Sequence, residues 1–409
     1  MPASTILSDV RALAGYQGFT KLAVARFISN LGNGITPVAM SFGVLGLPDG
    51  SPSQLSLVLG SQMVPLLLVM LFGGVVGDRY RRNKIVGGSD ILGSAFVLVS
   101  ATSFIFGFVS IPLLCVMGAC FGLLEALWWP AFSGVLPEIL PTEELQRGNS
   151  VIGLLTNFGY TGGALAGGVL VTIAGSGWAL AVDALSFFIA GLLVWSIDLP
   201  KIVRNNAGTM FQQLRDGWQE FIVRKWVVSV VVAFTFINLA YESTLGVLGP
   251  LATKEGGFGP REWSFMLAVS TVGMIITGLV LLRFTLSKPL IYGITPMLFM
   301  SLWIFSLTFS NDIVIPIVIS FFAGVAIEIF YVAWSTSMQH NIPEESYSRV
   351  ISYDALGSYA LAPIGLIFIG PLAELIGTKN ALYILAGLVL VATLSALSVR
   401  EVWMVRNQT

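Results

Sequence analysis

The segment Gly73–Lys84, GGVVGDRYRRNK, separates two long apolar runs and decides how the rest of the chain is interpreted. From Asp78 to Lys84 it contains one acidic and four basic residues, although only 11% of the whole chain is charged. Charged side chains are costly inside a lipid bilayer, so we expect this cluster to lie outside a membrane, at a tight turn between two helices. Its glycines allow the ends of those helices to approach closely.

The composition places the chain among membrane proteins. The 409 residues are 55% hydrophobic, and their charged fraction is less than half of the ~25% typical of soluble domains. The apolar runs reach the ~20 residues that a helix needs to cross a bilayer. They are continuously apolar rather than alternating, which favours helices over a barrel. The sequence therefore predicts an all-α polytopic membrane protein.

Twelve membrane spans are predicted, with ends uncertain by several residues. If both termini are cytoplasmic, the outer loops hold only Lys254, Arg261 and Lys379 of the 21 basic residues. Basic residues accumulate on the cytoplasmic side, so we expect this orientation, in a bacterial plasma (inner) membrane. The spans cover residues 19–46, 54–77, 85–108, 112–136, 149–174, 178–199, 226–252, 263–283, 289–309, 313–338, 350–375 and 380–403.

The chain is expected to consist of two six-helix bundles, residues 1–200 and 226–409, in which the second repeats the first. Residues 141–150 and 343–352 share Pro, Glu, Arg and Ser at a constant offset of 202 positions. Between the bundles, residues 201–225 are rich in charge and have apolar residues at three- and four-residue steps. We expect this linker to form an amphipathic helix on the cytoplasmic surface.

The charged turn resembles the signature loop of the major facilitator superfamily, Gly-x-x-x-Asp-Arg-x-x-Arg-Arg, between the second and third spans. The resemblance implies a rocking transporter with a central site between two bundles. It also implies a cytoplasmic gate in which the acidic residue caps a helix and the arginines pair with an acid of another span. The alternative is that these charges only set the topology. The gate candidates are Gly74, Asp78, Arg79, Arg82, Asp90 and Asp354.

Further strings resemble the drug–proton antiporter branch of that superfamily, which includes macrolide and enterobactin exporters. Residues Gly162–Gly168 are similar to the antiporter string Gly-Pro-x-x-x-Gly, matched here by Gly162, Gly163 and Gly167. Gly163 stands where that branch has proline, which implies a softer kink. The fourth span has no Arg, a residue that many proton-coupled drug exporters have there, and contains Glu125 instead.

Three glutamates lie well inside predicted spans: Glu125, Glu242 and Glu328. A carboxylate in mid-bilayer costs ~2.5–3.5 kcal/mol, so each needs a reason to be there. Superfamily architecture implies that their spans surround the central cavity. Such residues are expected to carry protons or to bind cargo. The alternative is a protonated carboxyl group that only forms a hydrogen bond between helices.

Other polar and aromatic residues within the spans are candidates for lining the cavity. Arg26 is expected to neutralise a nearby carboxylate, whose identity the sequence leaves open. The tryptophans are candidates for stacking against planar cargo, with ~0.5–2 kcal/mol from cation attraction, although aromatic residues in spans more often serve packing. The candidates are Arg26, Asn30, Asn33, Gln62, Asn157, Asn238, Tyr331, Trp128, Trp129 and Trp334.

The sequence thus predicts a proton-coupled exporter of amphipathic drugs or small metabolites, acting as a monomer on neutral or cationic cargo. A dedicated exporter of one metabolite, such as a siderophore, is the alternative of the same fold. A receptor or a membrane-embedded enzyme is the alternative of another class. His340 is the single histidine and no residue cluster has metal-ligand spacing, so no metal, cofactor or enzyme activity is expected. No nucleic-acid partner is expected.

Overall fold

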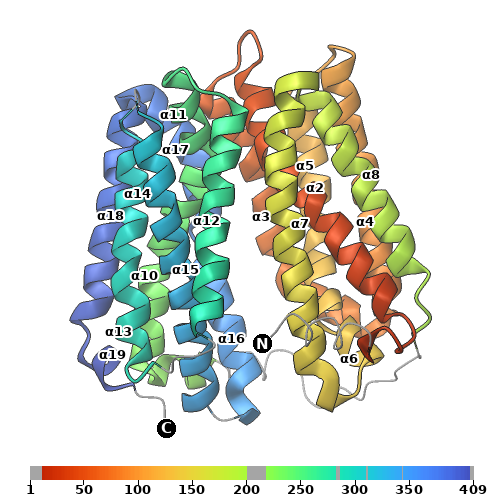
Figure 1. Cartoon of the computed structure of the whole chain (residues 1–409), viewed down its shortest axis with the longest axis vertical. Helices are drawn as coiled ribbons and strands as arrows, with labels where there is room; N and C mark the ends of the chain where they lie inside the picture. The colour runs from red at the N-terminus through yellow and green to blue at the C-terminus, as the bar shows by residue number, and fades with distance from the viewer. Residues whose placement is uncertain (1–11, 200–217, 282–285, 310–311, 343, 406–409) are drawn as a thin grey trace. The chain divides into compact units, whose positions relative to one another are not determined.

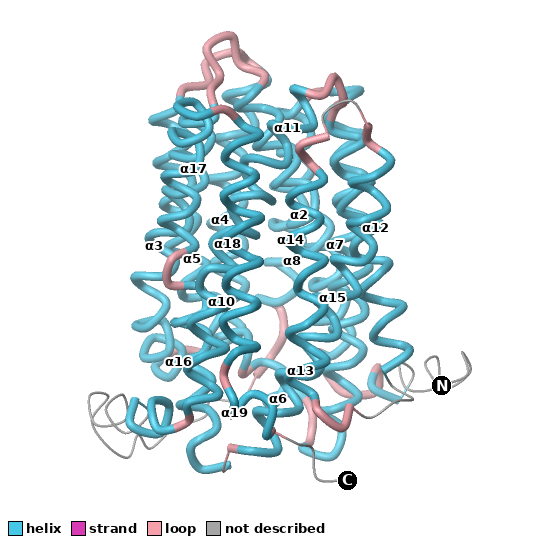
Figure 2. The backbone as a smooth tube through the Cα atoms, turned by 90° about the vertical axis from the view of Figure 1, so that its left-hand side faces the viewer, coloured by secondary structure: helices cyan, strands magenta, loops and turns pink. Residues whose placement is uncertain are grey.

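The computed structural model describes residues 12–199, 218–281, 286–309, 312–342 and 344–405. Within these ranges it does not describe the side chains of residues 71–79, 142, 146, 344–349 and 352. The described part is helical throughout and contains no strand (Figure 2). This confirms the prediction of an all-α protein.

The chain divides into two compact units. The first unit comprises residues 1–50 and 57–205, and the second comprises residues 51–56 and 206–409. In each unit, long helices run roughly alongside one another (Figure 1). Most of the expected linker helix falls outside the described residues.

The helices of the first unit follow the predicted spans closely. Each long helix begins and ends within a few residues of an apolar run. The elements are α2 (Phe19–Leu45), α3 (Pro52–Arg79, whose first turn groups with the second unit), α4 (Arg82–Ile105), α5 (Ile111–Ser133), α6 (Val135–Ile139), η1 (Thr142–Glu144), α7 (Leu145–Ala174) and α8 (Ser176–Trp195).

The second unit contains more interrupted helices. Several predicted spans are built from two or three consecutive helical pieces. The elements are α10 (Lys225–Ser243), the π-helical η2 (Thr244–Leu248), α11 (Gly249–Glu255), α12 (Pro260–Leu281), α13 (Pro289–Ile294), η3 (Thr295–Met297), α14 (Leu298–Ser306), α15 (Val314–Asn341), α16 (Glu344–Tyr359), α17 (Ala362–Ile376), α18 (Thr378–Ser398) and α19 (Arg400–Met404).

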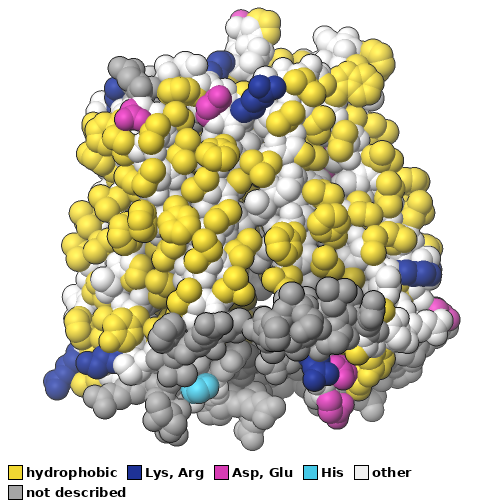
Figure 3. Space-filling model, in the orientation of Figure 1, with side chains coloured by type: hydrophobic (Ala, Val, Ile, Leu, Met, Phe, Trp, Pro, Cys, Tyr) yellow, Lys and Arg dark blue, Asp and Glu magenta, His cyan; other side chains and the backbone are white. Residues whose placement is uncertain are grey.

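Eleven helical segments in the described part are long and apolar enough to cross a membrane. The first predicted span, α2, is not among them, although it is 27 residues long, because it carries polar residues along its length. On the face of the molecule in Figure 3, hydrophobic side chains cover the helices and charged ones lie towards the helix ends. This distribution is that of an integral membrane protein.

The interruption of the eleventh predicted span, between α16 and α17, has a local cause. Pro363 has no N–H group, and its ring conflicts with the carbonyl four residues earlier, so the helix breaks at residues 360–361. Side chains of α10 compensate for the break. Thr235 Oγ1 donates to the carbonyl of Gly357 at 2.8 Å, and Asn238 Nδ2 donates to that of Ser358 at 2.9 Å. The carbonyl groups of Gly357 and Ser358, beside the break, therefore have side-chain donors.

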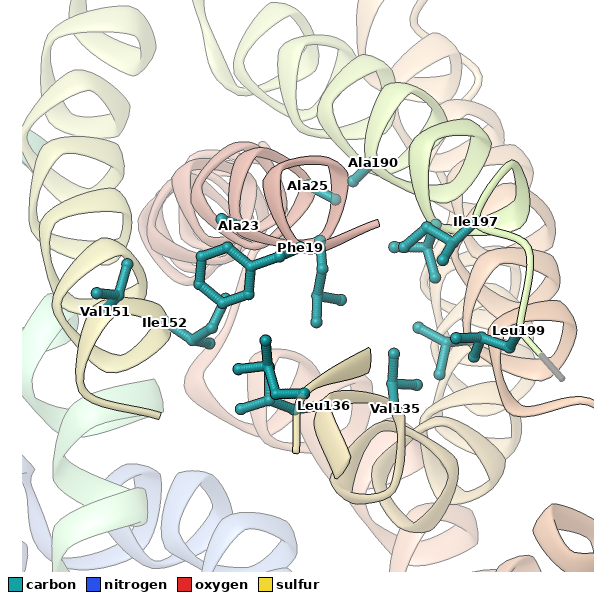
Figure 4. Close-up of a cluster of buried hydrophobic side chains, with 14 of the residues drawn as sticks. Phe19, Ala23, Ala25, Val135, Leu136, Val151, Ile152, Ala190, Ile197 and Leu199 are labelled. Atoms are coloured by element: carbon teal, nitrogen blue, oxygen red, sulfur yellow. The ribbon is translucent and has the colours of Figure 1, made fainter. Parts of the chain in front are cut away.

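A buried hydrophobic cluster closes one end of the first unit, where α2 begins and α8 ends (Figure 4). Phe19 of α2 is 2% exposed, and side chains from α6, α7 and the segment after α8 point towards it. Polar side chains satisfy the carbonyl groups at the end of α8 beside this cluster. Lys84 Nζ donates to the carbonyl of Trp195 at 2.9 Å, and Asn83 Nδ2 donates to that of Ile197 at 2.7 Å.

Glycine sets the distance between α2 and α7. A Cβ atom added to Gly163 would overlap the backbone of Leu31, whereas one added to Gly162 would meet only the Leu31 side chain, at 3.4 Å. The proline that the antiporter string has at this position is replaced here by a residue without a side chain. Gly163 therefore permits a close crossing of the two helices.

We predict that Gly163→Ala destabilises the protein by about 1–3 kcal/mol, because the added methyl group forces α2 and α7 apart. The matched control is Gly162→Ala, which should leave stability unchanged or raise it by up to ~1 kcal/mol through the better helix propensity of alanine. Thermal unfolding of the purified variants in detergent compares them. Equal melting temperatures for the two variants would contradict the prediction.

Candidate functional site

A pocket of about 160 Å³ lies inside the first unit, between α2, α4, α5, α7 and α8. One part of its lining is apolar and mostly aromatic, and the other part carries hydroxyl, amide and charged groups. Phe121, Leu124, Trp128, Trp129 and Phe187 form the apolar part; Arg26, Ser29, Asn30, Asn33, Ser89, Asp90, Glu125 and Thr156 form the polar part.

Arg26 of α2 lies over two stacked aromatic rings of α5. Its guanidinium carbon is 4.9 Å from the centroid of the Trp128 ring and 4.4 Å from that of Phe132. These rings are nearly parallel, at 10°, with centroids 4.6 Å apart. The two residues are four positions apart on α5, which places their side chains one above the other on the same helix face. The position of Arg26 therefore depends on cation–π contact.

Asp90 of α4 provides the negative charge next to Arg26. It is only 6% exposed, and its charge interacts with those of Arg26 and Glu125. The indole N–H of Trp128 lies near Asp90 but outside hydrogen-bonding geometry. The sequence prediction placed Asp90 in the gate, yet among the described side chains it lies in the pocket. Asp90 lies in the third turn of α4, which places it deeper than a position at the loop would.

Glu125 of α5 accepts a hydrogen bond from Gln62 of α3, with Nε2 and Oε2 3.1 Å apart. The two helices cross at Gly122, one turn earlier, where a Cβ atom would overlap the backbone of Gln62. This close crossing brings the amide within reach of the carboxyl group. Among the residues that line the pocket, Arg26 is the only base, against the two acids Asp90 and Glu125.

Asp183 of α8 forms a second buried acidic group outside the pocket. It has no exposed surface and accepts hydrogen bonds from the hydroxyl groups of Thr36 and Ser186. Gly32 of α2 leaves the space for the carboxyl group, since a Cβ atom there would overlap it. Asp183 therefore joins α8 to α2 through a buried hydrogen bond with Thr36.

The gate predicted around the charged turn is described only in part. Gly74, Asp78 and Arg79 lie outside the described side chains. Arg82, expected to pair with Asp90 or Asp354, has Nε 3.6 Å from Oε1 of Glu138. Its guanidinium group fills the space beside Gly134, where a Cβ atom would overlap it. Burial raises the pKa of Glu138, so on acidification this ion pair is lost at a higher pH than an exposed glutamate would require.

Asp354 of α16, another gate candidate, has described partners within its own unit. Its Oδ2 accepts a hydrogen bond from the indole N–H of Trp334 at 2.9 Å, and its Oδ1 accepts one from Ser358 at 3.1 Å. Trp334, predicted to line the cavity, is 9% exposed and held by this bond. Both residues thus join α15 to α16 within the second unit.

The two glutamates of the second unit have different surroundings. Glu242 lies near the end of α10, just before the π-helical turn, and its charge interacts with Tyr359 at the end of α16. Glu328 of α15 faces α12, where a Cβ atom on Gly278 would lie 3.2 Å from Oε1. Gly122 of α5 and Gly324 of α15 are equivalent positions in the two units. On each of these helices, the nearby glutamate faces a neighbouring helix: Glu125 faces α3, and Glu328 faces α12.

Some of the residues predicted to line the central cavity lie outside this pocket. Asn157 is exposed and is not among the residues that line the pocket. Asn238 supports the break between α16 and α17, and Tyr331 is 64% exposed. Asn30, Asn33, Trp128 and Trp129 do line the pocket. The spacing of polar residues along a span could not show which of them face the pocket. It also gave no reason to select Phe132, which has no polar group.

Comparison with known proteins gives a consistent result. Residues 22–364 match the family model described as Major Facilitator Superfamily. The multidrug efflux pump Tap of Mycolicibacterium fortuitum is 24% identical over 86% of this chain and 88% of its own. The macrolide efflux protein A of Streptococcus pyogenes is 25% identical over 91% of this chain and 93% of its own. A bacterial homologue of the human lysosomal transporter Spinster has a similar fold, with a TM-score of 0.75, 14% identity and 98% coverage of both chains.

We predict that Thr36→Val destabilises the first unit by about 1–3 kcal/mol, because it removes a hydroxyl donor from the buried Asp183 while preserving the shape of the side chain. Thr36→Ser retains the hydroxyl and should melt within a few degrees of the wild type. Thermal unfolding in detergent measures both variants. A valine variant as stable as the serine variant would show that Asp183 does not depend on this bond.

Proposed function

Because the chain belongs to the Major Facilitator Superfamily, we propose that it is a proton-driven exporter of amphipathic drugs or small metabolites. The observation that supports this most directly is the pocket of the first unit, where aromatic walls adjoin two acids and one base. Aromatic surface suits the apolar part of an amphipathic molecule, and the excess of acid suits a cationic or neutral one.

Glu125 is the proposed exchange group. Asp90 lies beside Arg26, so its charge is balanced, whereas the contact described for Glu125 is the neutral amide of Gln62. An uncompensated carboxylate at membrane depth costs ~2.5–3.5 kcal/mol. Glu125 therefore holds either a proton or a cationic cargo, but not both. Competition between a proton and the cargo for the same carboxyl group is the simplest basis for antiport.

The direction of transport is proposed from relatives and charge. Two similar proteins are named as efflux pumps for macrolides and for multiple drugs. The distribution of basic residues favours cytoplasmic termini in a bacterial inner membrane. A potential of 100 mV supplies ~2.3 kcal/mol for each charge that moves inward. For a neutral cargo exchanged with one proton, this energy drives export; for a monovalent cation exchanged with one proton, the two charge movements cancel and only the pH difference drives export.

Glu328 and Glu242 are proposed to act in the second unit. Glu328 faces Gly278, and within the described part of the chain it has no hydrogen bond like the one between Glu125 and Gln62. Glu242 lies beside a π-helical turn. Short π-helical segments often occur at functional sites. A dedicated metabolite exporter with the same coupling is the second candidate, and a growth-inhibition panel of drugs separates the two.

We predict that Glu125→Gln lowers proton-driven accumulation of ethidium in everted membrane vesicles by at least about tenfold, because glutamine cannot exchange a proton for a cation. Glu143→Gln, at an exposed position, is the control and should transport as the wild type does. Full transport by Glu125→Gln would remove this residue from the mechanism.

Glu328→Gln tests whether the second unit contributes to proton coupling. If Glu328 carries protons, its variant should fail to accumulate ethidium against a gradient but should still exchange internal for external ethidium without a proton gradient. Loss of both activities would instead assign Glu328 to cargo binding. Retention of both would exclude either role.

A further inference from the structure

The two units contain the same pair of stacked aromatic rings. In the first unit the pair is Trp128 and Phe132, and in the second it is Phe330 and Trp334, each displaced by the repeat offset of 202 positions. The first pair is 4.6 Å apart at 10°, and the second is 6.0 Å apart at 15°. Equivalent helices, α5 and α15, thus present equivalent aromatic faces.

These two faces are covered by different chemical groups. In the second unit, α10 covers the pair with further aromatic rings: Trp226 lies 5.6 Å from Trp334, and Phe234 lies 3.7 Å from Phe330. In the first unit, Trp128 and Phe132 also pack against the buried hydrophobic cluster, but the side chain of α2 that lies over both rings is a cation, Arg26. An aromatic face that needed only packing could be covered by aromatic rings, as the second unit demonstrates. The cation in the first unit therefore needs another explanation.

The surroundings of Arg26 have the composition of a binding site for an organic cation. Two stacked rings face the guanidinium group, and the carboxyl group of Asp90 lines the same pocket. Aromatic surfaces combined with negative charge are a common means of recognising organic cations. Among the residues that the structure describes, none forms a hydrogen bond with the buried Arg26 Nε. The position of the Arg26 side chain therefore depends strongly on cation–π contact and on charge. Another cation could make the same interactions.

The size of the pocket is consistent with partial occupation by the protein itself. Its volume of about 160 Å³ is below the ~300–1,000 Å³ of typical ligand pockets. The Arg26 side chain, which lines the pocket, occupies the space directly over the rings. Moving this side chain aside would enlarge the pocket where the aromatic surface and Asp90 meet.

We propose that Arg26 is an internal substitute for the cargo, and that an aromatic organic cation binds over Trp128 and Phe132, next to Asp90, by displacing the Arg26 side chain. This inference rests on the proposed function, for which it specifies the cargo class. Arg26 then sets specificity by competition: a cation must interact with the rings and Asp90 better than the guanidinium group does. In the absence of cargo, Arg26 keeps Asp90 compensated.

Equilibrium binding of tetraphenylphosphonium, an aromatic cation, to the purified full-length protein in detergent tests this proposal. Arg26→Gln removes the internal competitor and leaves Asp90 without its cation, so we expect it to bind tetraphenylphosphonium at least about 5-fold more tightly than the wild type. Adding Asp90→Asn to this variant should abolish the gain. Arg147→Gln, an exposed arginine in the same unit, is the control and should not change the affinity.

Equal or weaker binding by Arg26→Gln would overturn the proposal, and weaker binding would show that Arg26 itself contacts the cargo. If this variant does not elute as a folded protein, Arg26→Met is the second variant, with the same expected gain and the same contradicting result. The assay measures binding without transport, so its outcome is independent of the vesicle experiments on Glu125. Tighter binding together with absent export would uphold the site and refute the transport function.

Discussion

The structure of the first unit depends on balancing charge at a depth where water is scarce. Arg26 and Asp90 lie on different helices, and neither could be buried at reasonable cost without the other. Both α2 and α4 pack against α8, which brings the two residues to the same pocket. The stacked rings of α5 then complete the surroundings of the cation. Side chains from three helices thus meet at Arg26, and they line one part of the pocket.

Glycine makes this arrangement sterically possible. Gly32 leaves room for the carboxyl group of Asp183, Gly122 lets α3 approach α5, and Gly163 lets α7 approach α2. Helices in a membrane gain little from the hydrophobic effect and associate by close packing and hydrogen bonds. Small residues therefore decide which polar side chains come within reach of each other. The bond between Gln62 and Glu125 is one result.

The architecture could be predicted from the sequence because it follows from long apolar runs and the placement of charge. Pocket residues such as Glu125 and Trp128 could also be predicted, because an acid or a tryptophan inside an apolar run is easily noticed. The contacts between these side chains could not be predicted, because they depend on how each helix is rotated about its axis and where the helices cross. Periodicity could not assign Asp90 to Arg26 or Trp334 to Asp354, and nothing in the sequence distinguished Phe132 from other apolar residues.

The break between α16 and α17 has a mechanical consequence. An ordinary helix bent within lipid would lose backbone hydrogen bonds at a high energetic cost. Here Thr235 and Asn238 already hold the carbonyl groups at the break, so α16 is tethered to α10 rather than to its own continuation. The angle between α16 and α17 can therefore change while the carbonyl groups of Gly357 and Ser358 keep their donors from α10.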